Sequence, residues 1–124
     1  MPKASGTVLL VDDDPSIRNL LARYLEKEGF KTSQAEDGID ALVKLRDTLP
    51  KVIVTDLQMP RMSGWELIYV ARRRFPTIPI VVLSGSIPRE IPAEVKPDRW
   101  FEKSINGLPD LVQAIGGLAQ ERPR

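Results

Sequence analysis

Three short, continuous apolar runs restrict the fold of this chain more than any other feature. They occupy residues 8–11, 52–54 and 80–83, and each is rich in β-branched side chains. A strand with one face in water alternates apolar and polar residues, and these runs do not alternate. They therefore predict buried strands that are covered on both faces, as in a parallel sheet.

Weaker strand patterns and four helical patterns surround these runs. We expect further strands at residues 31–35 and 100–101. In the helical patterns, apolar residues recur three and four positions apart, and capping residues set the limits. The helices are predicted to begin after Asp14, after Asp37-Gly38, at the Ser63–Glu66 capping box and at Pro109, and the first and last to end at Gly29 and at Gly116-Gly117.

The alternation of strands and helices is typical of an α/β fold with a doubly wound sheet. The chain has 124 residues, which fits one domain. One position in the alternation is irregular, because Pro88, Pro92 and Pro97 interrupt the helix expected before the last strand. Interior proline costs a helix about 3 kcal/mol. We predict a loop or a single short turn there.

Composition excludes several kinds of site. The chain has no cysteine and no histidine, so a metal bound here must be a hard cation with oxygen ligands. The net charge of +1 is too small to attract nucleic acid or anionic lipid over the whole surface. No apolar run suits a membrane span, and the N-terminal residues lack the apolar stretch of a signal peptide. We expect a cytoplasmic protein that binds neither nucleic acid nor membrane.

Residues that can carry chemistry follow the ends of the predicted strands. They are Asp12 and Asp13, Asp56, Ser84 and Gly85, and Lys103. The carboxyl ends of parallel strands open onto one crevice, and ligands bind there in sheets of this kind. We therefore expect these side chains to converge.

Three aspartates in one crevice need a counter-charge. Two like charges about 5 Å apart repel by roughly 3 kcal/mol at an effective dielectric of ~20. Mg²⁺ suits such a site, because it takes oxygen ligands and keeps several waters. An attack of the Asp56 carboxylate on phosphorus would give an aspartyl phosphate. Lys103, the Ser84 hydroxyl and the Gly85 N–H would then be available to bind the phosphoryl oxygens.

Five segments match a known family. They read VLLVDDDPSIR, EDGIDAL, VIVTDLQMPRMSG, VVLSGS and FEKS. Over nearly its whole length, the chain resembles the receiver domain of two-component response regulators, the CheY-like superfamily. The resemblance implies a flavodoxin-like, five-stranded parallel sheet of order 2-1-3-4-5 with helices on both faces. It also implies a single receiver domain over residues 1–124, in which the last few residues are a short tail.

The resemblance implies that Asp56 is the phosphorylation site. Asp13, Asp56 and the backbone carbonyl of Gln58 would bind Mg²⁺ directly, and Asp12 would act mainly through a metal-bound water. The donor would be a sensor histidine kinase or a histidine phosphotransfer protein, and the downstream protein target is unknown. Such a domain catalyses the transfer of the phosphoryl group from the donor to itself and then slowly hydrolyses its own acyl phosphate. We therefore do not expect a metabolic enzyme.

Other matching positions would bind the phosphoryl group or respond to it. Lys103, Ser84 and the backbone of Gly85 would contact its oxygens, and Gln58 would tune its lifetime. Ser84 would also be the switch hydroxyl. Trp100 would be the switch aromatic residue, at a position where the family usually has Tyr or Phe.

Three features depart from the family pattern. The family usually has a proline after the lysine, joined by a cis bond, whereas here Ser104 follows Lys103, so we expect a trans bond and some freedom in how Lys103 approaches. The fourth family helix, part of the usual output face, is expected to be shortened or lost. Trp100 is bulkier than the usual ring, and we expect it to stay outward and to weaken the coupling with the hydroxyl.

Two other functions stay open from the sequence. A receiver that signals by phosphorylation-independent docking would fit the Lys103-Ser104 junction and the missing helix, but not the complete acidic set. A haloacid-dehalogenase-type phosphatase also uses a nucleophilic aspartate, but its chemistry requires a second aspartate two residues later, and this chain has Gln58 at that position. The sequence does not decide between a stand-alone receiver and a piece of a longer regulator or hybrid kinase.

Overall fold

The fold is built on five strands that lie side by side in one sheet. The computed structural model describes residues 6–86 and 88–120. In sheet order the strands are β2 (Lys31–Ala35), β1 (Thr7–Val11), β3 (Val52–Thr55), β4 (Ile80–Ser84) and β5 (Arg99–Glu102). The helices are α1 (Pro15–Lys27), α2 (Gly38–Asp47), α3 (Gly64–Arg74) and α4 (Leu108–Gln120). Every neighbouring pair of strands is parallel, so the predicted parallel sheet of order 2-1-3-4-5 is confirmed.

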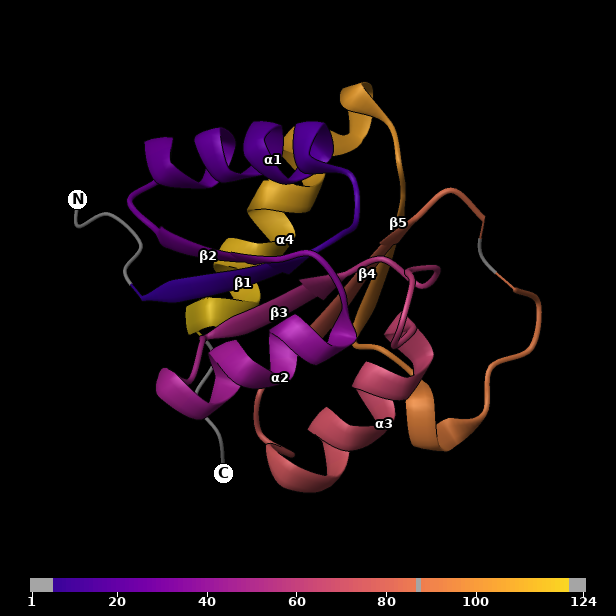
Figure 1. The fold of residues 1–124 in the computed structure, drawn as a ribbon. Coiled ribbons are helices and arrows are strands. Elements are labelled where there is room, and N and C mark those ends of the chain that lie inside the picture. Colours follow the sequence, from indigo (N-terminus) through magenta and orange to yellow (C-terminus); the bar gives the residue numbers. More distant parts are fainter. Residues whose placement is uncertain (1–5, 87, 121–124) are drawn as a thin grey trace.

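Helices cover both faces of the sheet. Helices α1 and α4 lie on one face, and α2 and α3 lie on the other (Figure 1). Successive residues of β1 point to opposite faces: Val8 packs with α1 and α4, and Leu9 packs with α2 and α3. Burial on both faces explains why the strand runs are continuous and apolar. In the part of the chain that the structure describes, no helix combines the length and the apolar character that a membrane span requires.

Capping residues set where three of the helices begin. The Asp14 carboxylate accepts a hydrogen bond at 2.9 Å from the first turn of α1, and Asp37 does the same for α2 at 2.9 Å. Ser63 and Glu66 form the predicted capping box of α3. Each cap satisfies N–H groups that a helix leaves unpaired at its start, so the short-range sequence signals hold here.

The last helix is longer than predicted. The prediction that it stops at Gly116-Gly117 is wrong, because α4 continues through both glycines to Gln120. Interior glycine costs a helix about 1 kcal/mol relative to alanine. Burial of the apolar face offsets this cost, since Ile115 is fully buried and Leu118 packs against the same core.

The segment between β4 and β5 has no full helix among its described residues, as the prolines predicted. It contains one 3₁₀ turn, η1 (Ala93–Val95). Val95, Trp65 and Trp100 pack against the core cluster on the side of α2 and α3. The rings of Trp65 and Trp100 meet edge to face, with centroids 6.5 Å apart and planes at 72°. Bulky side chains thus cover the β4–β5 part of this face in place of a helix.

Candidate functional site

The predicted acidic residues leave the sheet at its carboxyl edge. Val11 of β1 and Thr55 of β3 are in register, so Asp12 and Asp56 follow directly on two neighbouring strands. The Asp56 N–H donates to the Val11 carbonyl at 2.9 Å, which extends the ladder one residue beyond β3. Parallel pairing therefore brings these two carboxyl groups close together.

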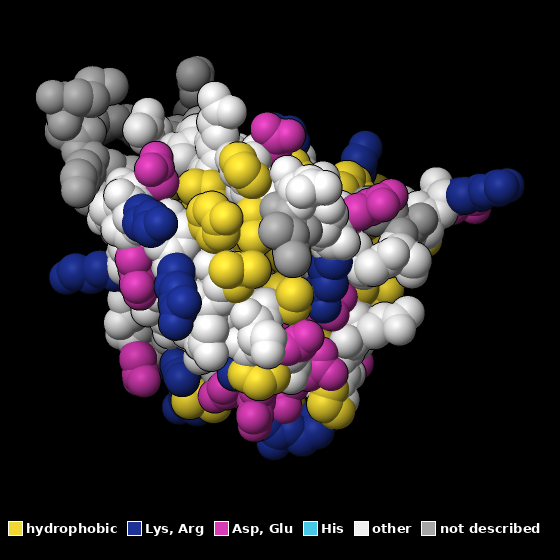
Figure 2. All heavy atoms as spheres, turned by 90° about the horizontal axis from the view of Figure 1, so that it is seen from above, with side chains coloured by type: hydrophobic (Ala, Val, Ile, Leu, Met, Phe, Trp, Pro, Cys, Tyr) yellow, Lys and Arg dark blue, Asp and Glu magenta, His cyan; other side chains and the backbone are white. Residues whose placement is uncertain are grey.

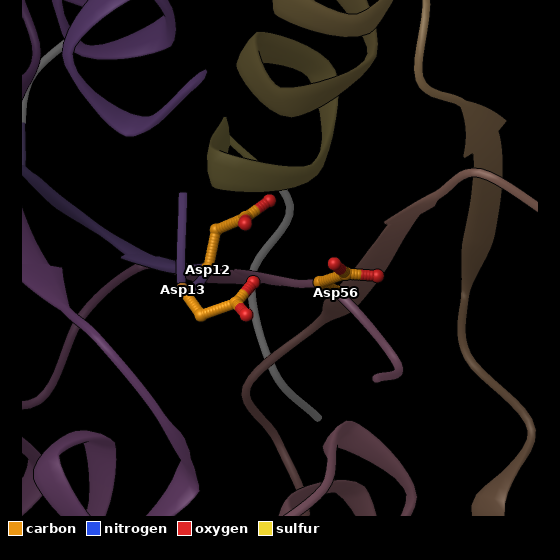
Figure 3. A group of neighbouring side chains, drawn as sticks. All are labelled: Asp12, Asp13 and Asp56. Atoms are coloured by element: carbon orange, nitrogen blue, oxygen red, sulfur yellow. The ribbon is translucent and has the colours of Figure 1, made fainter. Parts of the chain in front are cut away.

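Three carboxylates meet at this edge. Asp12, Asp13 and Asp56 each offer one oxygen, and these oxygens all lie within 4.8 Å of one another. Asp12 and Asp56 are buried, whereas Asp13 is exposed. Figure 3 shows Asp12 and Asp13 on the segment that follows β1, and Asp56 beside them at the end of β3. The structure thus brings together the aspartates that the sequence singled out.

Lys103 supplies the counter-charge. Its Nζ lies 2.7 Å from Asp56 Oδ2 and 2.8 Å from Asp12 Oδ2. Its own N–H donates to the Ser84 carbonyl at 2.9 Å, which holds the start of the β5–α4 connection against β4. The Lys103–Ser104 bond is trans, as expected. The expected freedom of Lys103 is not seen in this structure, because one ammonium bridges two buried carboxylates.

Burial and pairing act against each other on the ionisation of this group. Burial alone would lower the pKa of Lys103, but hydrogen bonds and charge attraction from Asp12 and Asp56 outweigh it and hold that pKa above its ordinary value. Burial raises the pKa of Asp12, and the contacts with Lys103 and with the Asp14 N–H reduce this rise without cancelling it. The lysine therefore stays charged at neutral pH, and Asp12 ionises at a cost.

The second oxygen of each buried carboxylate accepts a backbone hydrogen bond. Leu57 N–H donates to Asp56 Oδ1 at 2.7 Å, and Asp14 N–H donates to Asp12 Oδ1 at 2.9 Å. These bonds fix the orientation of both carboxyl groups. The donor set consists only of oxygens, and three carboxylates carry more negative charge than one lysine balances. Such a set fits a hard divalent cation like Mg²⁺.

The remaining predicted residues lie at the end of β4, in the loop after β3 and on β5. Ser84 is buried at the end of β4, the strand next to β3, and Gly85 follows it at the surface. Gln58 is exposed, two residues beyond Asp56. Trp100 lies in register with Val82, two residues before the end of β4, and its half-buried ring packs against that of Trp65.

Two further contacts around the site have no signal in the sequence. Arg18 of α1 donates to the Asp12 carbonyl at 2.5 Å and to the Gln34 side chain at 3.1 Å. Gly64 packs against the backbone of the phosphoacceptor candidate, because a Cβ there would lie 1.9 Å from the Asp56 carbonyl oxygen. Position 64 therefore has no room for a side chain and requires glycine. No local sequence pattern shows this requirement.

An apolar pocket opens beside Lys103. It has a volume of about 150 Å³ and is lined by Ile17, Leu20, Leu83, Lys103, Ser104 and Leu108. Its apolar walls come from α1, from the end of β4 and from the start of α4. Figure 2 views this side of the molecule from above α1 and α4 and shows hydrophobic side chains gathered at its centre.

Fold and site together define a class of protein: a doubly wound parallel α/β domain with a lysine-bridged acidic group at the carboxyl edge of its sheet. Comparison with known families names the class. The family model of the response regulator receiver domain matches residues 8–96. The chain therefore belongs to the receiver domains of two-component systems, as the sequence motifs indicated.

Individual relatives agree with this assignment. NtrX, a nitrogen assimilation regulatory protein of Azorhizobium caulinodans, is 39% identical over 80 residues, which are 63% of this chain and 18% of NtrX. An uncharacterized 14.6 kDa protein of Leptolyngbya boryana is 42% identical over 84 residues, which are 66% of this chain and 64% of that protein. The chain thus spans less than a fifth of NtrX and under two thirds of the smaller relative.

Solved structures show the same fold. CheY4, a chemotaxis response regulator of Vibrio cholerae, superposes with a TM-score of 0.80 at 30% identity, over 90% of this chain and 98% of CheY4. The response regulator TrrA of Thermotoga maritima, solved in complex with Mg²⁺ and BeF, gives a TM-score of 0.78 at 29% identity, over 88% of this chain and 97% of TrrA.

Proposed function

We propose that Asp56 accepts a phosphoryl group, in the presence of Mg²⁺, from a histidine of a sensor kinase or phosphotransfer protein. One observation carries the proposal: the Asp56 carboxylate has a lysine 2.7 Å away and shares its surroundings with the carboxylates of Asp12 and Asp13. A nucleophile for phosphorus needs a nearby cation to neutralise the charge that builds up on the phosphoryl oxygens. Asp56 has such a cation in Lys103.

In the proposed step, one Asp56 carboxylate oxygen forms a bond to phosphorus as the bond between phosphorus and the donor imidazole nitrogen breaks. The electron pair of the broken bond stays on the imidazole. The Leu57 N–H holds Asp56 Oδ1, so Oδ2 is the oxygen that becomes free when Lys103 turns toward the incoming group. The ammonium then pairs with a phosphoryl oxygen while the ring of the donor leaves.

Asp12, Asp13, Asp56 and the backbone carbonyl of Gln58 would hold Mg²⁺. When bound, the ion neutralises oxygens of the carboxylate and of the phosphoryl group, which is its usual part in phosphoryl transfer. The exposed Asp13 gives the cation a way in from solvent, and the buried Asp12 keeps its orientation through its bond with the Asp14 N–H.

Three further residues would bind or sense the phosphoryl group. Ser84 ends the neighbouring strand, from which its hydroxyl can donate to a phosphoryl oxygen, and the exposed Gly85 offers its N–H. Gln58 is exposed two residues beyond Asp56, and its side chain would control the access of water and thus the lifetime of the acyl phosphate. A shift of Ser84 would be passed along β4 toward Trp100, whose change in packing would signal the new state.

The apolar pocket beside Lys103 supports docking of the donor protein. A phosphohistidine must approach the Asp56 carboxylate closely, so the donor has to bind next to the acidic group. Ile17 and Leu20 of α1 and Leu108 of α4 offer apolar surface at this place. A helix that carries the histidine could bury its own apolar side chains there.

The test is intact mass after incubation with a small acyl phosphate and Mg²⁺. Wild type is expected to gain one phosphoryl group, and Asp56→Asn none. Asp47→Asn, an exposed aspartate at the end of α2, serves as a matched control and should behave as wild type. A wild type that gains nothing with Mg²⁺ present would overturn the proposal and favour a receiver that docks without phosphorylation.

A further inference from the structure

Arg61 adopts a backbone conformation that arginine rarely takes. Its φ is +66°, and it is the one non-glycine residue with positive φ among those the structure describes. Side chains other than those of glycine, asparagine and aspartate disfavour this region, because Cβ crowds the backbone. Such a conformation persists only where the surrounding structure compensates for it, and it often marks a functional segment. Arg61 lies in loop 57–63, the segment between Asp56 and α3 that also carries Gln58.

The side chain of Arg61 supplies this compensation through Asp37. Its Nε lies 2.6 Å and its Nη2 2.5 Å from Asp37 Oδ2, and Nη2 also lies 3.6 Å from Glu36 Oε1. Asp37 is only 2% exposed, and its other oxygen accepts the Asp40 N–H at 2.9 Å as the cap of α2. Charged hydrogen bonds of this kind are the strongest that a protein makes between side chains.

The ionisation of Asp37 agrees with a strong pair. Burial alone would raise the pKa of Asp37, but the hydrogen bond from the Asp40 N–H and the Arg61 guanidinium outweigh burial and lower that pKa below its ordinary value. Asp37 is therefore fully charged at neutral pH, and Arg61 neutralises a carboxylate that the fold has buried.

A second contact joins the same two segments one residue further along. The Gly38 N–H donates to the Met62 carbonyl at 3.1 Å. A Cβ at Gly38 would lie 2.5 Å from Met62 Cγ, so the Met62 side chain packs directly over the backbone of Gly38. The pairs 37–61 and 38–62 thus bind the start of α2 to loop 57–63 at two consecutive positions.

This attachment also reaches the other acidic segment of the site. The start of α2 follows the end of β2, where the Ala35 carbonyl accepts the Asp12 N–H at 3.1 Å. On the other side, the Gly64 N–H donates to the Leu57 carbonyl at 2.9 Å and closes loop 57–63. The start of α2 is therefore held to the segment of Asp12 on one side and to the loop of Gln58 on the other.

We propose that the Asp37–Arg61 ion pair is a positioning clamp, which holds loop 57–63 in place and so preforms the cation site around Asp56. This inference rests on the proposed function, because it concerns the same site. The clamp acts through the backbone, so Asp37 and Arg61 are positioning residues rather than ligands. It links elements that the acidic group itself does not connect, namely the start of α2 and the loop after β3.

The test compares Arg61→Asn and Asp37→Asn, singly and together. Asparagine tolerates positive φ and is a good helix cap, so both changes remove charge while keeping the local backbone. The Kd for Mg²⁺ is measured by titration of tryptophan fluorescence, and the phosphorylation rate with a small acyl phosphate. We expect each single variant to bind Mg²⁺ about tenfold more weakly, as is usual when a group that orients a metal site is lost. The double variant should be no weaker than the singles.

Controls separate the clamp from a merely structural role. Arg46→Asn removes an exposed arginine from the last turn of α2 and should leave the Kd for Mg²⁺ unchanged. Arg61→Lys keeps the charge without the planar fork and should recover part of the affinity. Urea unfolding confirms that each variant is folded at the temperature of the titration.

The outcomes are distinct. Arg61→Asn with the wild-type Kd and phosphorylation rate, or single variants whose effects add up in the double variant, would overturn the clamp while leaving the function of Asp56 intact. A wild type that neither binds Mg²⁺ nor takes a phosphoryl group would instead overturn the proposed function on which the clamp rests.

Discussion

Lys103→Met removes the one ammonium that bridges the two buried carboxylates while keeping most of the side-chain volume. The distances from Lys103 Nζ to Asp56 and Asp12 are 2.7 and 2.8 Å, and the carboxylate oxygens lie within 4.8 Å of each other. At an effective dielectric of ~20, two charges at this separation repel by about 3.5 kcal/mol. Removal of one partner from a buried ion pair is usually destabilising by about 3–5 kcal/mol.

Both arguments give the same magnitude, so we expect the free energy of unfolding to fall by about 3 kcal/mol at neutral pH without divalent cations. The assay is urea unfolding in the presence of a chelator, with circular dichroism and tryptophan fluorescence as probes. Lys27→Met, an exposed lysine at the end of α1, is the matched control and should change stability by less than about 0.5 kcal/mol.

A second substitution tests the cause. Asp12→Asn in the Lys103→Met background removes one of the two repelling charges, so it should recover most of the lost stability. In the wild-type background, Asp12→Asn also removes a favourable partner of Lys103. There it should not raise the free energy of unfolding by a comparable amount. A loss below about 1 kcal/mol for Lys103→Met, or no recovery by Asp12→Asn, would show that the lysine does not balance a charged pair.

Three further predictions concern other parts of the fold. Gly64→Ala should lower the free energy of unfolding by about 3 kcal/mol in urea titrations, because the new Cβ would lie 1.9 Å from the Asp56 carbonyl oxygen. An unfolding midpoint equal to that of wild type would contradict this prediction. Gly117→Ala should stabilise by about 1 kcal/mol, since Gly117 is inside α4 and a Cβ there meets nothing within 4 Å; a lower melting temperature would refute it. The folded-state pKa of Asp37 is lowered, so its charge stabilises above pH 3.8 and this contribution is lost as pH falls below 3.8. Stability should therefore fall less steeply in acid for Asp37→Asn than for wild type, and parallel stability curves would rule this out.

Among the described residues between β4 and β5, packed tryptophan rings cover part of the surface and no full helix does. Trp65 and Trp100 pack edge to face where η1 is the only helical turn among the described residues between β4 and β5. Trp65 lies in the first turn of α3, directly after loop 57–63, and Trp100 lies on β5. The contact therefore joins the segment beside Asp56 to the edge strand. A change at Asp56 would therefore have a short path to the β5 edge through these two rings.

The sequence alone determined the sheet and the acidic group. Continuous β-branched runs report burial on both faces, which is a local property of each strand, and the helix caps Asp14 and Ser63 are short-range signals as well. A carboxylate that directly follows a parallel strand must lie at the carboxyl edge of the sheet, so the convergence of Asp12 and Asp56 followed from topology.

The tertiary structure decided how those groups are held. Lys103 bridges two carboxylates and lies 47 residues from Asp56, and Arg61 holds a carboxylate 24 residues away. The position of Lys103 after a strand predicted that it would approach Asp56, but not that it would bridge two carboxylates, and nothing near Arg61 in the sequence signals its partner Asp37. The extension of α4 through Gly116 is of the same kind, because packing against the core overrides a local preference that favours an end to the helix. Local patterns fix elements and their ends, and contacts between distant segments exist only once the chain has folded.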